Sequence, residues 1–391
     1  MKRIQMVKFD FNLAPKEAIK YLQNKGYKLS FDYNEIQKAA HHKSFTVAKI
    51  TRLDLLHDVF TSLDDSLKTG KHFDDFKKEI VPTLQKKGWW GKQDIINPRT
   101  GEVKTIDIGS RRLKNIYDTN MRVSYAQARH KQMRALPLSV YWRYQSALLE
   151  STRDKHAAMH GTIKHRDDSW WNTNYPPNGW GCKCKVTARS LKEIEKKGWK
   201  IEKGSSSNIA SKDWDYNVGD TSKVSQLSKI DLDKSLSTLS TLKSIKKDSY
   251  KNLSEKELES KFYKTMGIKE GEIFIDKVND PMIIDKSLFL SASGHSKIKK
   301  QNRHLYLDEI AKTIKEPHEI YLEFDVGKIT GEKRVLKKMF RYLNDDGKQR
   351  ALLVIFEYLK DKTQGVSAYY VKEATQVNKR RFEKLIYKKE D

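Results

Sequence analysis

The sequence predicts a multidomain protein, with a mainly α-helical N-terminal module and a C-terminal α+β domain in which a helix precedes an antiparallel sheet. Three observations predict this fold class. The chain has 391 residues, which is long for a single hydrophobic core. Apolar residues recur with the helical period in the first part, and short β-type runs alternate with turn residues in the last part. Between the two, serine, lysine and aspartate dominate the composition.

Three helices are expected in the N-terminal module, which we assign to residues 1–200. Over residues 46–70 the apolar side chains follow the helical period, and the final glycine provides a C-terminal stop. A second, shorter helix is expected over 75–87. A third is expected to begin at Ser110, a residue type that is favoured as an N-cap.

A polar linker is expected over residues 201–252. This segment is rich in Ser, Lys and Asp, contains few aromatic residues and shows no sustained period. A marginal helix is expected within it, over residues 230–245.

The C-terminal domain is assigned to residues 253–391. It begins with an amphipathic helix expected over 297–317, where a proline ends the pattern. Turn signals, among them Gly347 and Gly365, separate the strands that follow. The expected strands are 319–324, 334–343, 351–359, 366–371 and 384–388. A helix followed by an antiparallel meander predicts an α+β domain.

The net charge of +26, from 77 Lys and Arg against 51 Asp and Glu, indicates a polyanionic partner, above all nucleic acid. A lysine-rich solvated surface would give the same excess, so this second interpretation stays open. No apolar run reaches the ~18 residues that cross a bilayer. The N-terminus lacks the apolar core and cleavage site of a secretory signal, and the chain has only two cysteines. We therefore expect synthesis in a cytoplasm.

Both cysteines lie in the stretch "NYPPNGWGCKC", at Cys182 and Cys184. Upstream, His156 and His160 are four residues apart and would share one face of a helix. Together these four residues have the composition of a tetrahedral zinc site. A disulfide between the cysteines would be strained, because only one residue separates them. A third interpretation is an irregular corner that holds buried thiols and hydrogen-bonded histidines without a metal.

The segment "YQSALLESTRDKHAAMHGTIKHRDDSWWNTNYPPNGWGCKCKVTA" resembles the signature of the phage Mu F-like minor head proteins, the phage head morphogenesis family. Lys183 stands where arginine is usual. The segments "RRLKNIYDTNMRVSYAQAR", "KGWWGK" and "DWDYNVG" resemble other parts of the family, so the likeness covers most of residues 1–220. The matching positions are Arg153, His156, Gly161, Asp167, Asp168, Trp170, Pro176, Pro177, Asn178, Cys182 and Cys184.

This resemblance implies a minor capsid component that is present in few copies in the virion. Its expected partners are the phage portal and capsid proteins and the packaged DNA. Contact with packaged DNA would also explain the positive charge of the chain.

Residues 288–388 resemble the phage-type barnase–EndoU–colicin–RelE-like nuclease domains. The segments that carry the likeness are "RHLYLDEIAKTIKEPHEIYLEF", "LKKMFRYL", "ALLVIFEYL", "GVSAYY" and "RRFEKLIYK". Ser367 stands where threonine is frequent, and Phe382 or Glu383 stands where a glycine is usual. The resemblance implies a nuclease domain. No His-rich or carboxylate-rich cluster stands out in its sequence, which disfavours a two-metal nuclease, so we expect a metal-independent endoribonuclease without a cofactor.

Metal-independent RNA cleavage needs a base for the 2′-hydroxyl, an acid for the leaving oxygen and cations around the phosphorus. His295 and His304 are candidates for proton transfer, with Glu319 or Glu323 as an alternative base. The other candidate catalytic residues are Arg341, Ser367 and Tyr387, and the candidate substrate-binding residues are Arg303, Lys338, Arg380 and Arg381.

Two functions are therefore expected from the sequence. The first is a head protein whose C-terminal ribonuclease is a toxin for the host cell, with an immunity protein as a further partner. The second is a head-assembly protein whose basic C-terminal domain binds DNA or a capsid partner without catalysis. An ADP-ribosyltransferase is disfavoured, because no Glu-x-Glu or Gln-x-Glu pair lies in a suitable C-terminal strand.

Overall fold

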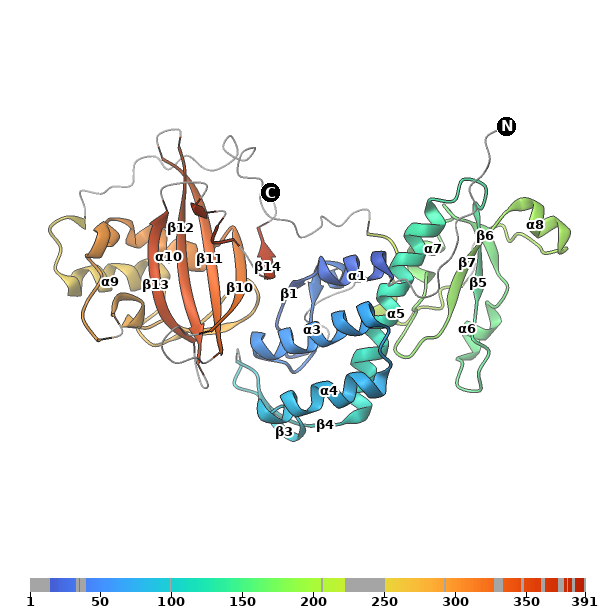
Figure 1. Cartoon of the computed structure of the whole chain (residues 1–391). Coiled ribbons are helices and arrows are strands. Elements are labelled where there is room, and N and C mark those ends of the chain that lie inside the picture. Colours follow the sequence, from blue (N-terminus) through green and yellow to red (C-terminus); the bar gives the residue numbers. More distant parts are fainter. Residues whose placement is uncertain are drawn as a thin grey trace.

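The computed structural model describes residues 15–32, 35, 40–98, 100–204, 207–221, 250–291, 293–326, 333–345, 348–359, 363–371, 376–377, 379–381 and 384–389. The N-terminal module is mainly helical, and the C-terminal domain contains a five-stranded antiparallel sheet with helices beside it (Figure 1). The predicted fold class is confirmed. The helix expected over 230–245 lies outside the described residues.

The long helices of the N-terminal module are α1 (Lys16–Gln23), α3 (Leu53–Thr69), α4 (Phe73–Lys86) and α5 (Ser110–Arg134). The end of α3 is as predicted, because Gly70 follows it with a left-handed φ of 72°. Its start is later than predicted, because residues 48–49 form a turn, with Lys49 at a left-handed φ of 67°, and Ile50 forms an isolated β-bridge with Ser30. Pro82 lies inside α4, and Ser110 is the first residue of α5 rather than its cap.

Small sheets connect these helices. The parallel pair β1 (Gly26–Tyr27) and β2 (Ser44–Phe45) lies beside α3, and β3 (Gly91–Ile96) pairs with β4 (Val103–Ile108). The central strand β5 (Tyr141–Gln145) lies between β6 (Ile163–His165) and β7 (Lys185–Arg189). Four short helices complete the module: α2 (Ala40–Lys43), α6 (Asp154–Ala158), α7 (Trp171–Asn174) and α8 (Leu191–Lys196).

Both ends of the predicted linker, residues 201–252, belong to the packed structure. Ile209, Trp214 and Val218 are buried against the N-terminal module, and Tyr250 is buried in the core that includes the C-terminal helices. These apolar residues are surrounded by polar residues in the sequence, so the composition of the segment assigned them to the linker. Residues 222–249 lie outside the described part of the chain.

The C-terminal sheet has the strand order β13-β12-β11-β10-β14, and all its pairs are antiparallel. The first four strands form the predicted meander, and the last returns to lie beside the first. Gly365 lies within a strand instead of a turn, where a Cβ atom would meet the Leu288 backbone at 2.8 Å. The strands are β10 (Glu319–Val326), β11 (Lys333–Asp345), β12 (Lys348–Tyr358), β13 (Thr363–Val371) and β14 (Lys384–Lys388).

The helices of this domain differ from the prediction. The helix expected over 297–317 is shorter, because α10 spans only Leu307–Lys315. Before it, residues 300–306 form 3₁₀ turns that are interrupted at Gln301 and Asn302, whose φ values are 56° and 58°. A further helix, α9 (Glu255–Met266), begins with a capping box from Ser254 and Glu257. Two short strands, β8 (Ile273–Ile275) and β9 (Pro281–Ile283), follow α9.

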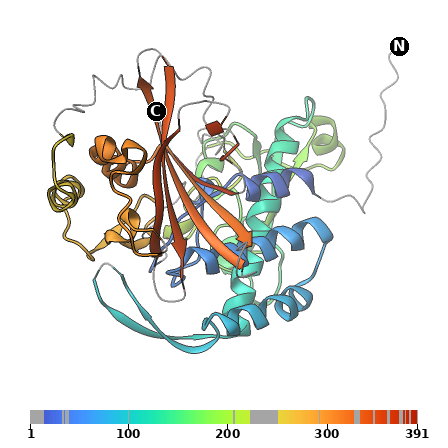
Figure 2. The ribbon, with the colours of Figure 1, turned by 60° about the vertical axis from the view of Figure 1, so that its left-hand side comes forward.

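The two faces of the sheet have different surroundings. Met339, Leu352 and Val354 share a core with α9 and α10, which lie on one side of the sheet (Figure 2). Residues of the opposite parity, such as Phe340 and Leu353, form a second cluster on the other face. Because side chains alternate along a strand, each position of β11 is assigned to one face by its parity.

The two modules contact each other at the β10–β14 edge of the sheet. The short strand β1 lies next to β14 (Figure 1). The Lys384 ammonium donates to the Gln23 carbonyl at 2.8 Å, and the Leu29 amide donates to the Val278 carbonyl at 2.8 Å. The His57 ring stacks on Phe324, with 3.9 Å between ring centres. The hydrophobic core is continuous across this contact.

Candidate functional site

Three of the four predicted metal ligands lie together in the N-terminal module. The Nδ1 atom of His156, in α6, lies 3.7 Å from each of the Cys182 and Cys184 sulfurs. These two cysteines lie just before β7, in the loop that contains Pro176 and Pro177. The ligand atoms of all three residues lie within 4.8 Å of one another. Cys182 and His156 are buried.

His160 is not part of this group. The helix α6 ends at Ala158, so the predicted helical face does not extend to His160. The His160 Nδ1 atom instead lies 3.2 Å from the Ser146 carbonyl oxygen. The expected four-ligand set is therefore corrected to His156, Cys182 and Cys184.

The electrostatics of the group favour one thiolate. The pKa of Cys184 is lowered to about 4, chiefly by its hydrogen bond with Cys182 and to a smaller extent by contacts with His156 and Tyr144. The pKa of Cys182 is raised, chiefly by its hydrogen bond with Cys184 and then by burial. Both thiols are free, so the disulfide is not formed. Once Cys182 also loses its proton, two thiolates and an imidazole at this spacing can coordinate zinc.

In the C-terminal domain, strand alternation separates residues that were predicted to act together. Lys338 faces away from α10, whereas Arg341 faces toward it. The Arg341 Nη1 donates to the Glu316 carbonyl at 3.1 Å, and its Nε lies 3.6 Å from the Glu309 carboxylate. Lys338 forms an ion pair with Glu323. Arg341 therefore holds the end of α10 and does not lie beside Lys338.

A buried polar network lies on the face of the sheet away from the helices. The Glu319 carboxylate accepts hydrogen bonds from the Arg381 Nη2, at 2.8 Å, and from the Tyr342 hydroxyl. The Arg381 Nε donates to the Tyr321 hydroxyl at 3.3 Å. Arg381 is 2% exposed and neutralises Glu319, so it is not available to bind a phosphate group. Glu319 is held in the same ion pair, which disfavours it as the general base.

The remaining predicted residues are spread over the domain. Arg380 donates from Nε to the Tyr369 hydroxyl at 3.1 Å and is partly exposed. Ser367 lies on β13 opposite Ile355, and Tyr387 lies on β14 against the helix-side core. His295 is exposed, and its Nδ1 lies 3.0 Å from a hydroxyl two residues away. No described hydrogen bond joins any of these residues to His304.

Lys297 and Arg303 lie close enough to interact electrostatically, and His304 follows Arg303 in the chain; we call these three basic residues the cationic corner. Arg303 is 6% exposed, yet its Nε and Nη1 atoms have no hydrogen-bond acceptor among the described residues. The Nδ1 atom of His304 also has no partner there. The Lys297 ammonium donates to the Val366 carbonyl at 2.5 Å. No carboxylate in the described structure pairs with these three residues.

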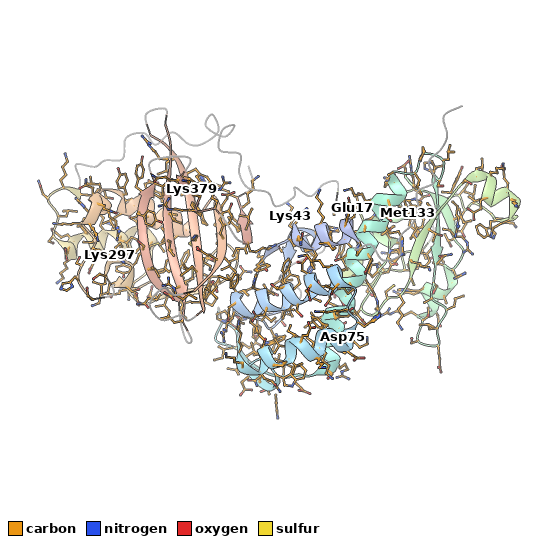
Figure 3. The ribbon with its side chains drawn as sticks, viewed as in Figure 1. Glu17, Lys43, Asp75, Met133, Lys297 and Lys379 are labelled. Atoms are coloured by element: carbon orange, nitrogen blue, oxygen red, sulfur yellow. The ribbon has the colours of Figure 1, made fainter. Side chains whose placement is uncertain are left out.

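The local fold holds this corner against the β13 edge of the sheet. The left-handed residues Gln301 and Asn302 turn the chain just before Arg303. Two residues after His304, the Tyr306 ring stacks on Tyr370 of β13, with 4.7 Å between ring centres. Lys297 is labelled in Figure 3, on the side of the domain where α9 and α10 lie.

Burial is the largest cause of the pKa shifts in the corner, and neighbouring positive charges add to it at two of the three residues. Burial lowers the pKa of Lys297, and the neighbouring Arg303 lowers it further. Burial and then Lys299 lower the pKa of His304, so this imidazole is neutral at pH 7. The pKa of Arg303 is also lowered by burial. Unpaired cations at close range form a site that an anion would stabilise.

Sequence reasoning found Arg303 and His304 but missed Lys297, which belongs to the basic run "KIKKQNRH". It also did not anticipate that Arg381 and Glu319 neutralise each other. Their pairing depends on the return of the chain to the sheet, far along the sequence.

Two comparisons with protein families agree with this division of the chain. Residues 57–187 match the family described as phage Mu protein F like protein. Residues 257–388 match the family described as phage-Barnase-EndoU-ColicinE5/D-RelE like nuclease2. No solved structure matches the chain, and among the described helices none is both long and apolar enough to cross a membrane.

Two curated relatives are each similar to about half of the chain. Protein F of Escherichia phage Mu, named for capsid assembly, is 39% identical over 196 residues, which are 50% of this chain and 44% of the relative. The Mu-like prophage FluMu F protein of Haemophilus influenzae is 35% identical over 175 residues, 44% of this chain and 41% of the relative. The chain thus spans less than half the length of both relatives. It combines a phage Mu F-like domain at residues 57–187 with a phage nuclease-family domain at residues 257–388.

Proposed function

We propose that this protein takes part in phage head assembly through its N-terminal module and cleaves RNA through its C-terminal domain. The cationic corner carries the second part of the proposal. A buried guanidinium with two unpaired N–H groups is unfavourable in the free protein. A phosphate group would provide the missing acceptors and neutralise the charge.

The chemistry of the corner suits cleavage by the 2′-hydroxyl of the substrate. The neutral His304 accepts the 2′-hydroxyl proton through Nε2 as the 2′-oxygen attacks phosphorus. Arg303 stabilises the additional negative charge on the phosphorane. The 5′-oxygen leaves and takes a proton, which Lys297 can supply because its pKa is lowered. The products are a 2′,3′-cyclic phosphate and a free 5′-hydroxyl.

The Mu F-like domain supports a place in the virion, next to portal and capsid proteins and packaged DNA. The net charge of +26 is consistent with such an environment. In this arrangement the nuclease domain would enter the host with the genome and act there as a toxin. Cells that make the protein would then need an immunity protein.

Inducible expression of the full chain tests the ribonuclease. The wild type should arrest growth and degrade RNA, and His304→Gln should abolish both. His295→Gln is the matched control, because His295 is exposed and lies outside the cationic corner. Full RNA degradation by His304→Gln would refute the assignment, and intact RNA with the wild type would favour the alternative of a non-catalytic DNA- or capsid-binding domain.

We also propose that His156, Cys182 and Cys184 hold a structural zinc ion. A fourth ligand would come from water or from a partner, because the described residues provide three. The ion would fix the loop that connects α7 to β7.

A further inference from the structure

The N-terminal module contains a cavity of about 260 Å³ that neither proposed activity uses. One wall is the face of α5 that carries Arg112, Thr119 and Asn120. The opposite walls come from Lys25 and from Trp180 and Trp214. This volume is close to the lower end of the range for small-ligand pockets.

The walls of this cavity come from segments that are far apart in the sequence. Arg112 lies near the start of α5, Trp180 lies in the loop of the two cysteines, and Trp214 lies in the segment "DWDYNVG". These are three of the segments through which the chain resembles the Mu F-like family. The cavity therefore provides a common structural role for motifs that do not participate in the cationic corner.

The cavity carries positive charge without a counterion. Lys25 is 5% exposed, and its ammonium lies 4.6 Å from the centre of the Tyr21 ring. No Asp or Glu is among the residues that line the cavity. Burial lowers the pKa of Lys25 to about 7. Among the described residues, the Arg112 Nη2 donates to the Ala48 carbonyl at 2.5 Å, but its buried Nε has no acceptor.

The remaining wall is aromatic. Trp180 and Trp214 meet edge to face, with 5.3 Å between ring centres, and Phe45 and Tyr216 lie beside them. Trp214 is buried, and its Nε1 finds no acceptor within the described structure. Aromatic walls of this kind bind flat apolar groups, including nucleobases.

We propose that this cavity binds an aromatic phosphate monoester of the size of a mononucleotide. A phosphate monoester carries nearly two negative charges at pH 7, which matches two cations better than a single carboxylate does. Its acceptor oxygens would pair with Lys25 and Arg112, and its aromatic part would contact the indoles. The site lies in a different module from the cationic corner and does not depend on it.

Titration of the full chain with AMP, followed by calorimetry and tryptophan fluorescence, tests this site. Adenosine, inorganic phosphate and benzoate are separate arms. AMP should bind saturably and more tightly than each of them, because only AMP provides both a phosphate group and a base. Lys25→Met should weaken AMP binding by about ten-fold or more, the loss expected for one charge-assisted hydrogen bond. Lys20→Met, an exposed lysine of α1 outside the cavity, should leave binding unchanged.

Thr119→Phe is a second variant that fills the cavity from the side of α5, and it should abolish AMP binding. Thermal unfolding shows whether both variants fold, and Lys25→Met should keep the wild-type melting temperature or raise it, since it removes an unpaired buried charge. The proposal is overturned if AMP does not saturate, if benzoate binds more tightly than AMP, if Lys25→Met binds AMP as tightly as the wild type does, or if Thr119→Phe still binds AMP.

Discussion

Substitution by methionine should change the free energy of unfolding in opposite directions at two buried arginines of the C-terminal domain. Arg303 is 6% exposed and Arg381 is 2% exposed, so both guanidinium groups have lost most of their water. Arg381 pairs with the Glu319 carboxylate at 2.8 Å. The Nε and Nη1 atoms of Arg303 have no acceptor among the described residues. Substitution by methionine keeps most of the aliphatic stem and removes only the charged end.

The expected changes in stability follow from these environments. Arg381→Met leaves Glu319 charged and buried, which should lower the free energy of unfolding by about 3–5 kcal/mol. Arg303→Met removes two unsatisfied N–H groups, and each of these costs about 1–3 kcal/mol in the folded state. After some packing is lost, we expect a gain of about 1 kcal/mol or more. The same variant should lose RNA cleavage, because it removes the group that stabilises the phosphorane.

Urea unfolding of the full-length variants, paired with an RNA cleavage assay, measures both effects. A more stable and inactive Arg303→Met protein would identify a residue kept for binding at the expense of stability. If Arg303→Met instead destabilised the protein as much as Arg381→Met does, Arg303 would have a structural role and the corner would lose its function. The reasoning also fails if Arg303→Met keeps full cleavage activity.

Three further predictions concern other parts of the molecule. Lys337→Met should lower the free energy of unfolding by about 3–5 kcal/mol, since it leaves Asp276 and Asp280 buried without their cation, and adding Asp276→Asn and Asp280→Asn should recover most of the loss in urea unfolding. Burial lowers the pKa of His57 from 6.5 to about 4, so between these values only the unfolded chain binds the proton. Stability should therefore fall as the pH falls through this window, by at most about 3 kcal/mol, and His57→Phe should flatten the pH profile of thermal unfolding. Purified protein never exposed to chelator should contain about one equivalent of zinc by elemental analysis, and Cys184→Ser should lose it; wild-type protein without zinc would leave only the metal-free corner.

The sheet was predictable from local signals, but part of the preceding helix was not. The five strands lie where β-type runs and turn residues place them, within a few residues at each end. The apolar pattern of 297–306 is helical in period, yet Gln301 and Asn302 adopt left-handed conformations. Tertiary contacts of residues 300–306 with β13, among them the stacking of Tyr306 on Tyr370, override the local preference there.

The site was predictable in part. The basic run ending in Arg303 and His304 lies in the segment where we propose the site, while Arg341 was grouped with Lys338. Because they are three residues apart, they lie on opposite faces of a strand, so the alternation of side chains along β11 already predicts that they do not act together. The neutralisation of Arg381 by Glu319 could not be predicted from the sequence, because 62 residues separate the partners.

The order of the strands bears on how the two modules work together. The N-terminal module contacts the β10–β14 edge, through Lys384 and Phe324. The cationic corner lies at the other edge, where Lys297 and Tyr306 contact β13. Since β13 and β14 are the outer strands of the sheet, docking of the modules does not cover the corner. We therefore expect the intact chain to cleave RNA without release of its nuclease domain, and cleavage that appears only after proteolysis between the modules would contradict this arrangement.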